Sequence, residues 1–452
     1  MRLKSILDSQ CGFRFFFENL NLQSSVARHV LMESYMSQST KEIANCYLEL
    51  EEFYKVFVSE DKFTYTLLSI QNKLSSLRDI RGTLSRLENG TVPDDIELYE
   101  IKGLALLYED IRVLFDGTFI KTVSFDDLSS IVELLDPEGH KITSFYIYDS
   151  YSDELKELRK EIRKESKYSS ELHYKASIIE DRIRKELSAK LIGLTQMLRR
   201  AIDTLSKIDI LIAESLQIRE LNLCIPKISK ERTSYFGLFN PEIKEIISKE
   251  GRSYQNVDIN FGPSIPLLIT GANMGGKTVV LKTLTLSQYL FQFGFGIPAK
   301  EAEIAPVSEI HFCIGDEQSI SKGLSSFAAE MERIDKVIKS VRSGKNILAL
   351  IDEPARTTNP TEGTALVKAL IKILSGKHFR MVLTSHYNID TGSCKRLRVK
   401  GYENGAMNYL LIEDNNTKAP QEALQIARAL GIDNEWIEEA EKSVDQVIYN
   451  KN

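Results

Sequence analysis

The sequence has few cysteines and no long apolar run, and both absences narrow the class of protein. Its 5 cysteines are scattered over 452 residues without a Cys-x-x-Cys pair, which argues against a disulfide framework or a zinc site and favours a reducing compartment. The longest apolar runs, such as Ile347 to Ile351, fall far short of the ~20 residues that span a bilayer. The N-terminal residues lack the sustained apolar segment of a secretory signal. A cytoplasmic protein without a membrane segment is therefore expected.

The chain also lacks a strong charge of one sign. Lys and Arg total 58 against 64 Asp and Glu, which leaves a net charge of -6. No global cationic field therefore draws the protein onto nucleic acid or anionic lipid, and any such surface must be local. The 42% hydrophobic content excludes a wholly disordered chain. At roughly 150 residues per domain, the length predicts two to three domains.

The first half of the chain has a helical pattern. Apolar residues recur at three- and four-residue steps over 39–210. Glycine and proline are absent between Gly139 and Gly193, which predicts two long helices meeting near Ser169, or one very long helix. Residues 151–200 carry a local charge excess of +4, from 13 basic and 9 acidic residues. A solvated helical face is the favoured interpretation of this charge, and a surface for nucleic acid or a partner protein is the alternative.

After Pro226 the pattern changes to short apolar runs that alternate with helical stretches, which is typical of a mostly parallel sheet. The last thirty or so residues return to helix, with Gly431 between two short helices. The best strand candidates are Pro266–Thr270, Ile310–Ile314, Ile347–Ile351 and Met381–Thr384.

A glycine-rich loop between a predicted strand and a predicted helix carries the clearest chemistry. It matches Gly-x-x-x-x-Gly-Lys-[Ser/Thr], whose backbone N–H groups wrap phosphate oxygens at a helix N-terminus. Lys277 is expected to reach the β- and γ-phosphates, and the Thr278 hydroxyl to ligate Mg²⁺. The predicted ATP-binding residues are Gly271, Ala272, Asn273, Met274, Gly275, Gly276, Lys277, Thr278 and Val279, with Tyr254 proposed to stack on the adenine.

Carboxylates that follow a second apolar run complete a P-loop site. Asp352 and Glu353 come directly after Ile347–Ile351. We expect Asp352 to hold Mg²⁺ through water, and Glu353 to act as the general base that polarises the attacking water. His386, just after another predicted strand, suits a side chain that senses the γ-phosphate. The predicted catalytic residues are thus Glu353, Lys277 and His386, and the predicted metal ligands are Thr278 and Asp352.

The segment between these two motifs points to a paired site. It runs from Gly315 to Phe327 and leads into an amphipathic helix. A serine at a helix N-terminus can offer its hydroxyl and backbone N–H to a γ-phosphate, and in a head-to-tail dimer that phosphate belongs to the other subunit. Gly323 and Ser325 are the residues predicted to act in trans. Read alone, the same residues are only a helix cap.

Taken together, these motifs resemble the MutS family of ABC-type ATPases. That family's loop typically reads TGPNMGGK, where this chain has TGANMGGK. GDEQSISKGLSSF and PTEG resemble the bacterial MutS branch that often carries a nuclease domain, and the helical half resembles the MutS core and lever helices. The likeness runs from about residue 60 onward and is most specific in 240–390. It implies an α/β P-loop ATPase domain preceded by an all-α core and lever domain, with ATP and Mg²⁺ as cofactors.

The predicted organisation follows from this resemblance. An N-terminal segment (1–38) precedes the helical core and lever domain (39–225). The P-loop ATPase domain (226–418) follows, and a helix-turn-helix (419–452) resembles the segment that helps MutS ATPase domains dimerise. The mismatch-reading domain, most of the DNA clamp and the nuclease domain are expected to be absent. Phe16-Phe17-Glu18 matches the Phe-x-Glu of the mismatch-recognition domain by chance, and is interpreted as a buried N-terminal segment of the chain.

One departure concerns the loop after Asp352-Glu353. Pro354-Ala-Arg-Thr-Thr-Asn lacks the glycine usual in the family's Gly-Arg-Gly-Thr or Gly-Ala-Gly-Thr. The departure puts the cross-subunit geometry of the loop in doubt, and leaves nucleotide binding unaffected.

Three functions stay open at this point. The first is a homodimeric ATPase that associates with duplex or branched DNA without reading mismatches, its dimer closure moving the helical levers. In the second, the chain resembles short MutS-like ATPases that accompany cobalamin-dependent lysine aminomutases and are thought to help reactivate them. The third is a nucleotide-dependent dimerisation switch with little turnover. The resemblance favours the first.

Overall fold

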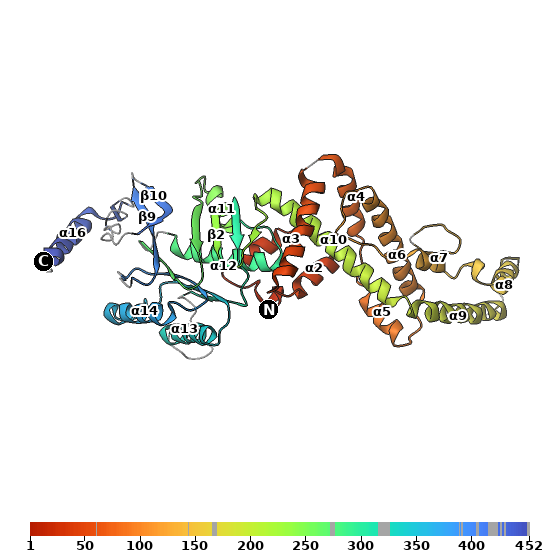
Figure 1. The fold of residues 1–452 in the computed structure, drawn as a ribbon. Coiled ribbons are helices and arrows are strands. Elements are labelled where there is room, and N and C mark those ends of the chain that lie inside the picture. The colour runs from red at the N-terminus through yellow and green to blue at the C-terminus, as the bar shows by residue number, and fades with distance from the viewer. Residues whose placement is uncertain are drawn as a thin grey trace.

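The structure is a computed structural model in which a helical half and a sheet-containing half lie end to end, with the N-terminus between them (Figure 1). It describes residues 1–452 except 60, 143, 165–169, 272–275, 315–325, 388, 390–391, 404–405, 415–423, 425–426, 429–430 and 450–452. Within this part of the chain, no helix is both long enough and apolar enough to cross a membrane.

The helical half is built around one long helix, α10, which contacts α2, α3, α5 and α6. Its buried residues lie on nearly all sides, including Leu198, Leu205 and Ile212, because helices surround it. The helices of this half are α1 (Phe13–Glu18), α2 (Ser25–Glu33), α3 (Thr40–Tyr54), α4 (Thr64–Leu74), α5 (Arg81–Glu88), α6 (Asp95–Asp116), α7 (Ser129–Leu135), α8 (Asp153–Lys164), α9 (Ser170–Ile192) and α10 (Thr195–Leu221).

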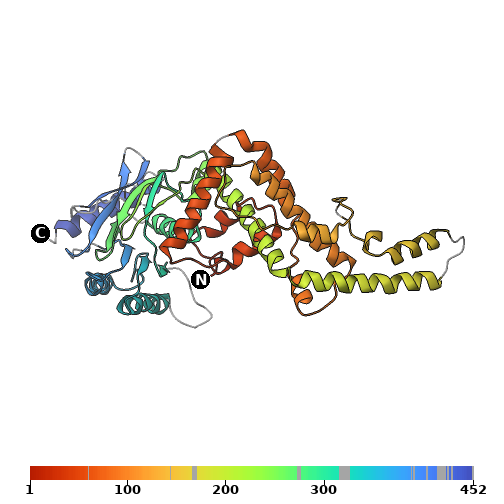
Figure 2. The same cartoon turned by 45° about the vertical axis from the view of Figure 1, so that its right-hand side comes forward.

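Helices α8 and α9 form the lever, an arm that extends away from the rest of the helical half (Figure 2). They contact each other along their length, and ion pairs between Arg159 and Glu180 and between Arg182 and Glu154 join them. The structure has two helices here and not one very long helix, since α8 and α9 are antiparallel neighbours joined by these ion pairs. The predicted meeting point near Ser169 lies outside the described residues.

The N-terminal segment packs into the body of the protein. Phe16 and Phe17 are buried, whereas Glu18 is exposed, as expected for a buried start. The Phe16 ring lies edge-on to Phe295, 5.6 Å away, at the end of the sheet-containing half. The carboxylate of Asp209 on α10 accepts hydrogen bonds from Ser24 N at 2.8 Å and from the Ser24 hydroxyl at 2.7 Å. The segment therefore bridges the two halves.

The sheet-containing half holds two sheets among the described residues. The larger has strand order β10-β9-β4-β8-β7-β6, parallel except for the β9–β10 hairpin, and the smaller has the order β1-β5-β2-β3. The four strands predicted from the sequence are confirmed as β4, β6, β7 and β8, and the smaller sheet was not predicted. The strands are β1 (Lys227–Ile228), β2 (Thr233–Leu238), β3 (Val257–Phe261), β4 (Leu267–Thr270), β5 (Glu301–Ile304), β6 (Glu309–Cys313), β7 (Ile347–Ile351), β8 (Arg380–Thr384), β9 (Lys395–Glu403) and β10 (Ala406–Glu413).

Helices cover both faces of the larger sheet, because successive side chains of a strand point to opposite faces. On β4, Leu267 and Ile269 belong to the core that contains α12, whereas Leu268 belongs to the core formed with α13 and α14. The helices of this half are α11 (Pro241–Lys249), α12 (Lys277–Phe293), α13 (Ser326–Arg342), α14 (Pro360–Leu374) and α16 (Asn434–Tyr449).

The two halves are hydrogen-bonded at the C-terminal end of α12. The Tyr47 hydroxyl on α3 lies 2.9 Å from Phe295 O and 3.2 Å from Phe291 O. The side-chain amide of Gln292 donates to Ser37 O at 2.7 Å, and Ser37 N donates to Gln292 O at 3.0 Å. These bonds satisfy carbonyl groups that a helix end leaves without intrahelical partners. The helix that begins in the glycine-rich loop thus ends against the helical half.

A buried ion pair holds the chain that leads into the lever. Lys102 on α6 donates to Asp136 at 2.9 Å, to the Tyr148 hydroxyl at 2.7 Å and to Ser144 O at 3.1 Å. The side chains of Lys102 and Asp136 are both fully buried. Removing one member of such a pair leaves the other charge buried and unpaired.

Replacing Lys102 is therefore expected to destabilise the helical half. Lys102→Met should lower the free energy of unfolding by about 3–5 kcal/mol, measured by urea denaturation followed by circular dichroism. Arg200→Met is the matched control, because Arg200 pairs with Asp126 at the surface and its loss should cost less than about 1 kcal/mol. Equal, small losses in both variants would contradict the anchoring role of Lys102.

Candidate nucleotide site

The glycine-rich loop joins β4 to α12, as predicted. Gly271 and Gly276 have φ angles of 129° and 72°, a region that glycine enters without the Cβ clash of other residues. Lys277, the first residue of α12, is buried. Its ammonium donates to Gly271 O at 2.7 Å and pairs with the Glu353 carboxylate at 3.2 Å. Thr278 and Val279 follow in the first turn of α12. The predicted phosphate-binding residues Ala272, Asn273, Met274 and Gly275 lie outside the described residues.

Thr278 and Asp352 come together at the carboxyl edge of the parallel sheet. The Thr278 hydroxyl donates to Asp352 Oδ2 at 2.7 Å, and Asp352 is 9% exposed. A hydroxyl and a carboxylate are the hard oxygen ligands that Mg²⁺ prefers, usually alongside waters and substrate phosphates. The donor set fits the predicted ion. Groups of three or more His, Cys, Asp or Glu able to hold a metal are absent from the described part of the chain.

Thr384, at the end of β8, organises both acidic residues. Its hydroxyl donates to Asp352 Oδ1 at 2.6 Å and accepts from Glu353 N at 2.9 Å. We did not predict this role from the sequence. The available signal was its place at the end of a strand next to β7, because the carboxyl ends of neighbouring parallel strands meet at one edge.

The Glu353 carboxylate lies between two cations. Oε1 is 3.2 Å from Lys277 Nζ, and Oε2 is 3.7 Å from Arg356 Nη1. Glu353 has a left-handed φ of 42°, which is rare outside glycine and concentrates at functional sites. Its side chain is 11% exposed, so the carboxylate sits at the edge of the buried site.

The other predicted site residues are placed as follows. His386 is exposed, and its ring centroid is 4.1 Å from that of Tyr387; γ-phosphate sensing by His386 stays a prediction. Gly323 and Ser325, predicted to act in trans, lie outside the described residues.

Two tyrosines, Tyr254 and Tyr409, bear on the prediction of adenine stacking. The Tyr254 hydroxyl accepts a hydrogen bond from Asn240 N at 3.1 Å, and burial raises the pKa of this phenol. Tyr409 on β10 packs against the loop, since a Cβ added to Gly276 would lie 3.2 Å from its ring. Tyr409 N donates to Gln255 Oε1 at 2.7 Å. Adenine stacking on Tyr254 stays a prediction, and Tyr409 is an aromatic neighbour of the loop that the linear sequence did not indicate.

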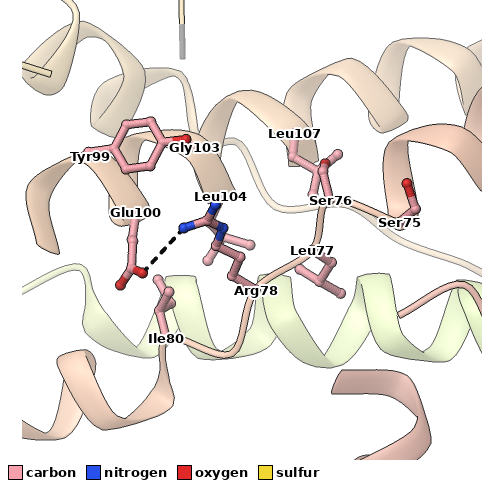
Figure 3. Close-up of a pocket in the computed structure, with 10 residues that line it drawn as sticks. All are labelled: Ser75, Ser76, Leu77, Arg78, Ile80, Tyr99, Glu100, Gly103, Leu104 and Leu107. Carbon is pink, nitrogen blue, oxygen red and sulfur yellow. Dashed lines mark ion pairs between the residues drawn. The ribbon is translucent and has the colours of Figure 1, made fainter. Parts of the chain in front are cut away.

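A separate pocket of about 280 Å³ lies in the helical half, between α6 and the turn from Ser75 to Ile80 (Figure 3). Its polar groups already have partners. The hydroxyls of Ser75 and Ser76 donate to backbone carbonyls, and Arg78 pairs with Glu100 at 3.8 Å. This pocket shares no residue with the nucleotide site.

Comparison with known proteins finds a family resemblance in most of the sheet-containing half. Residues 267–447 match the family MutS domain V, a P-loop ATPase domain. This region is therefore similar to MutS domain V. The chain is 30% identical over 402 residues to endonuclease MutS2 of Finegoldia magna, covering 86% of this chain and 48% of the relative. It is 33% identical over 285 residues to endonuclease MutS2 of Enterococcus faecalis, covering 58% and 34%.

These similarities support membership of the MutS family. Endonuclease MutS2 of Clostridium novyi extends the likeness to 90% of this chain, at 27% identity, and to 48% of the relative. The chain thus spans about half the length, or less, of these curated relatives. At 86% and 90% of this chain, the matched lengths extend beyond residues 267–447 into the helical half.

The hydroxyl of Thr384 gives a direct test of the site. Thr384→Val keeps the shape of the side chain but leaves Asp352 Oδ1 and Glu353 N without this partner. Because hydrogen bonds to charged groups contribute about 1.5–3 kcal/mol, Mg-ATP affinity measured by calorimetry should fall roughly 10- to 100-fold. Thr384→Ser retains the hydroxyl and should bind nearly as well as the natural protein. An equal loss in both variants would exclude the hydroxyl as the cause.

Proposed function

We propose that this protein is a Mg-ATP-dependent ATPase of the MutS type, whose nucleotide-driven dimer closure moves the helical levers. The supporting observation is that Lys277, Thr278, Asp352 and Glu353 converge within a MutS domain V. Lysine, a hydroxyl paired with a carboxylate and a second carboxylate are the parts that a P-loop hydrolase requires.

Each of these residues has a distinct task in hydrolysis. Lys277 binds the β- and γ-phosphates, and Thr278 and Asp352 would hold Mg²⁺, which neutralises phosphate charge when bound. Glu353 accepts a proton from water while the water oxygen attacks the γ-phosphorus. The bond from that phosphorus to the β–γ bridging oxygen breaks, and ADP leaves with the bonding electrons.

The Lys277–Glu353 ion pair suggests how binding prepares the base. A nucleotide phosphate and Glu353 are both anions, so they compete for the Lys277 ammonium. Drawing Lys277 toward phosphate weakens its hold on Glu353 and leaves the carboxylate available to water. The same event removes the salt bridge that opposes proton acceptance.

Dimerisation and lever movement belong to the same proposal. Gly323 and Ser325 would reach the γ-phosphate of the other subunit, so that ATP joins two protomers. The hydrogen bonds from Tyr47 on α3 to Phe291 O and from Gln292 on α12 to Ser37 O offer a route from the loop to the helical half. Movement of α12 would then be passed through α3 to α10 and the lever.

DNA, duplex or branched, is the proposed partner. The similar proteins are named endonucleases, and the lever helices α8 and α9 carry 10 basic and 8 acidic residues. Lys156, Lys164, Lys185 and Lys190 are exposed along it, so cationic groups are available to phosphates. A protein client such as an aminomutase is the alternative.

Glu353→Gln separates binding from hydrolysis. The amide keeps the size of the side chain but accepts no proton, so kcat should fall by about 10²–10⁴-fold. ATP binding should persist and trap a dimer, detected by size-exclusion chromatography with light scattering. Turnover at the normal rate would remove Glu353 from the role of general base.

Steady-state ATP hydrolysis with and without duplex or branched DNA tests the partner. Stimulation by DNA should decline as salt rises, because phosphate contacts release counterions. Lys164→Glu with Lys185→Glu should weaken the stimulation, whereas the same charge change at Lys41 and Lys377, exposed residues outside the lever, should not. Indifference to DNA with stimulation by a protein fraction would favour a protein client. ATP-driven association without phosphate release would favour a dimerisation switch.

A further inference from the structure

The loop that begins at Glu353 has an unusual backbone. Ala355 has a left-handed φ of 60°, so two non-glycine residues within three positions are left-handed. For residues other than glycine this conformation is unfavourable, and it persists where the surroundings enforce it. When Arg356 is matched to the arginine of the family pattern Gly-Arg-Gly-Thr, Ala355 falls at its first glycine. Contacts from the surrounding structure must therefore stabilise the left-handed backbone that a glycine would adopt by itself.

Two buried side chains hold the peptide groups of Ala355. The Tyr387 hydroxyl donates to Ala355 O at 2.9 Å, and Ala355 N donates to Glu330 Oε1 at 2.9 Å. Tyr387 follows β8 and Glu330 lies on α13, so the loop is gripped from two elements. Burial raises the pKa of both side chains, and Tyr387 consequently keeps the proton that it donates.

Gly363 on α14 makes room for this contact. A Cβ at residue 363 would lie 2.4 Å from the Tyr387 hydroxyl oxygen and 3.1 Å from Ala355 O. Even alanine at this position would displace one of the two bonded groups. Glycine within a helix is unfavourable for the helix itself. The close packing of Tyr387 gives a physical reason for a glycine at position 363.

The hydrogen bonds that hold Ala355 also restrict the backbone of Glu353. Only Pro354 separates the two residues, and Glu353 N donates a hydrogen bond to the Thr384 hydroxyl. The direction of the Glu353 side chain therefore depends on a short backbone segment held at both ends. A base must be placed within hydrogen-bond reach of the water that it deprotonates.

We propose that Tyr387 and Glu330 are positioning residues for Glu353, which act by holding Ala355 in its left-handed conformation. This inference rests on the proposed function, since it assigns how the general base of the ATPase is oriented. Neither residue needs to touch the nucleotide. Their loss should misplace the base and leave the binding of ATP intact.

The first test compares kcat and KM for ATP in Tyr387→Phe. Removing only the hydroxyl should lower kcat at least tenfold, with KM changed less than about twofold, because misplacing a reacting group impairs the chemical step. Tyr151→Phe is the matched control. Its hydroxyl donates to Leu134 O at 2.7 Å, the same kind of bond at the base of the lever, and its loss should leave kcat unchanged.

The second test distinguishes positioning from general stability. The double variant Tyr387→Phe with Ala355→Gly should have a kcat at least threefold higher than Tyr387→Phe alone, since glycine adopts a positive φ without the help of neighbouring side chains. Glu330→Gln keeps an acceptor for Ala355 N and should retain most of the activity, whereas Glu330→Met should lose it. Thermal melting of every variant checks that each is folded.

The outcomes separate this inference from the function on which it rests. No ATP hydrolysis by the natural protein would overturn the proposed ATPase, and the positioning role with it. Normal hydrolysis that Glu353→Gln abolishes but Tyr387→Phe leaves unchanged would overturn the positioning role alone. So would a kcat loss in Tyr387→Phe that Ala355→Gly does not relieve, together with equal losses in Glu330→Gln and Glu330→Met.

Discussion

The parallel pairing of β4, β8 and β7 is the constraint on which the rest of the site depends. Parallel strands bring their carboxyl ends to one edge of the sheet, and ligands of α/β proteins bind beyond that edge. The loop after β4 supplies Lys277 and Thr278, β7 leads to Asp352 and Glu353, and β8 ends at Thr384. Hydrogen bonds among these residues then set the site at ångström scale.

The same arrangement gives the nucleotide site a mechanical connection. Helix α12 begins at the phosphate loop, and near its other end Tyr47 of the helical half donates to Phe291 O while Gln292 donates to Ser37 O. A helix is stiff over a few turns, so displacement at one end reaches the other. Buried polar contacts such as those of Asp209 and Lys102 then tie α10 and the chain leading to the lever into one packed body.

The Ala355 loop shows how a departure from a family pattern can be tolerated. A positive φ without glycine is unfavourable, and here Tyr387, Glu330 and the space left by Gly363 hold the conformation. The missing glycine therefore leaves the backbone conformation of the loop intact. The described loop retains a left-handed position at Ala355, while its contacts across a dimer stay a prediction.

The sequence by itself determined the elements whose signals are local. The sequence predicted four core strands, the turn between β4 and α12, and the carboxylates after β7. Their signals are short apolar runs, glycines and strand ends, each of which spans only a few residues. The tertiary structure decided which distant residues complete the site. Thr384 meets Asp352 across 32 positions and Tyr387 meets Ala355 across 32, while Tyr409 reaches Gly276 from β10. Such contacts depend on how strands are ordered in the sheet and on which helix packs on each face, and no short-range pattern encodes either.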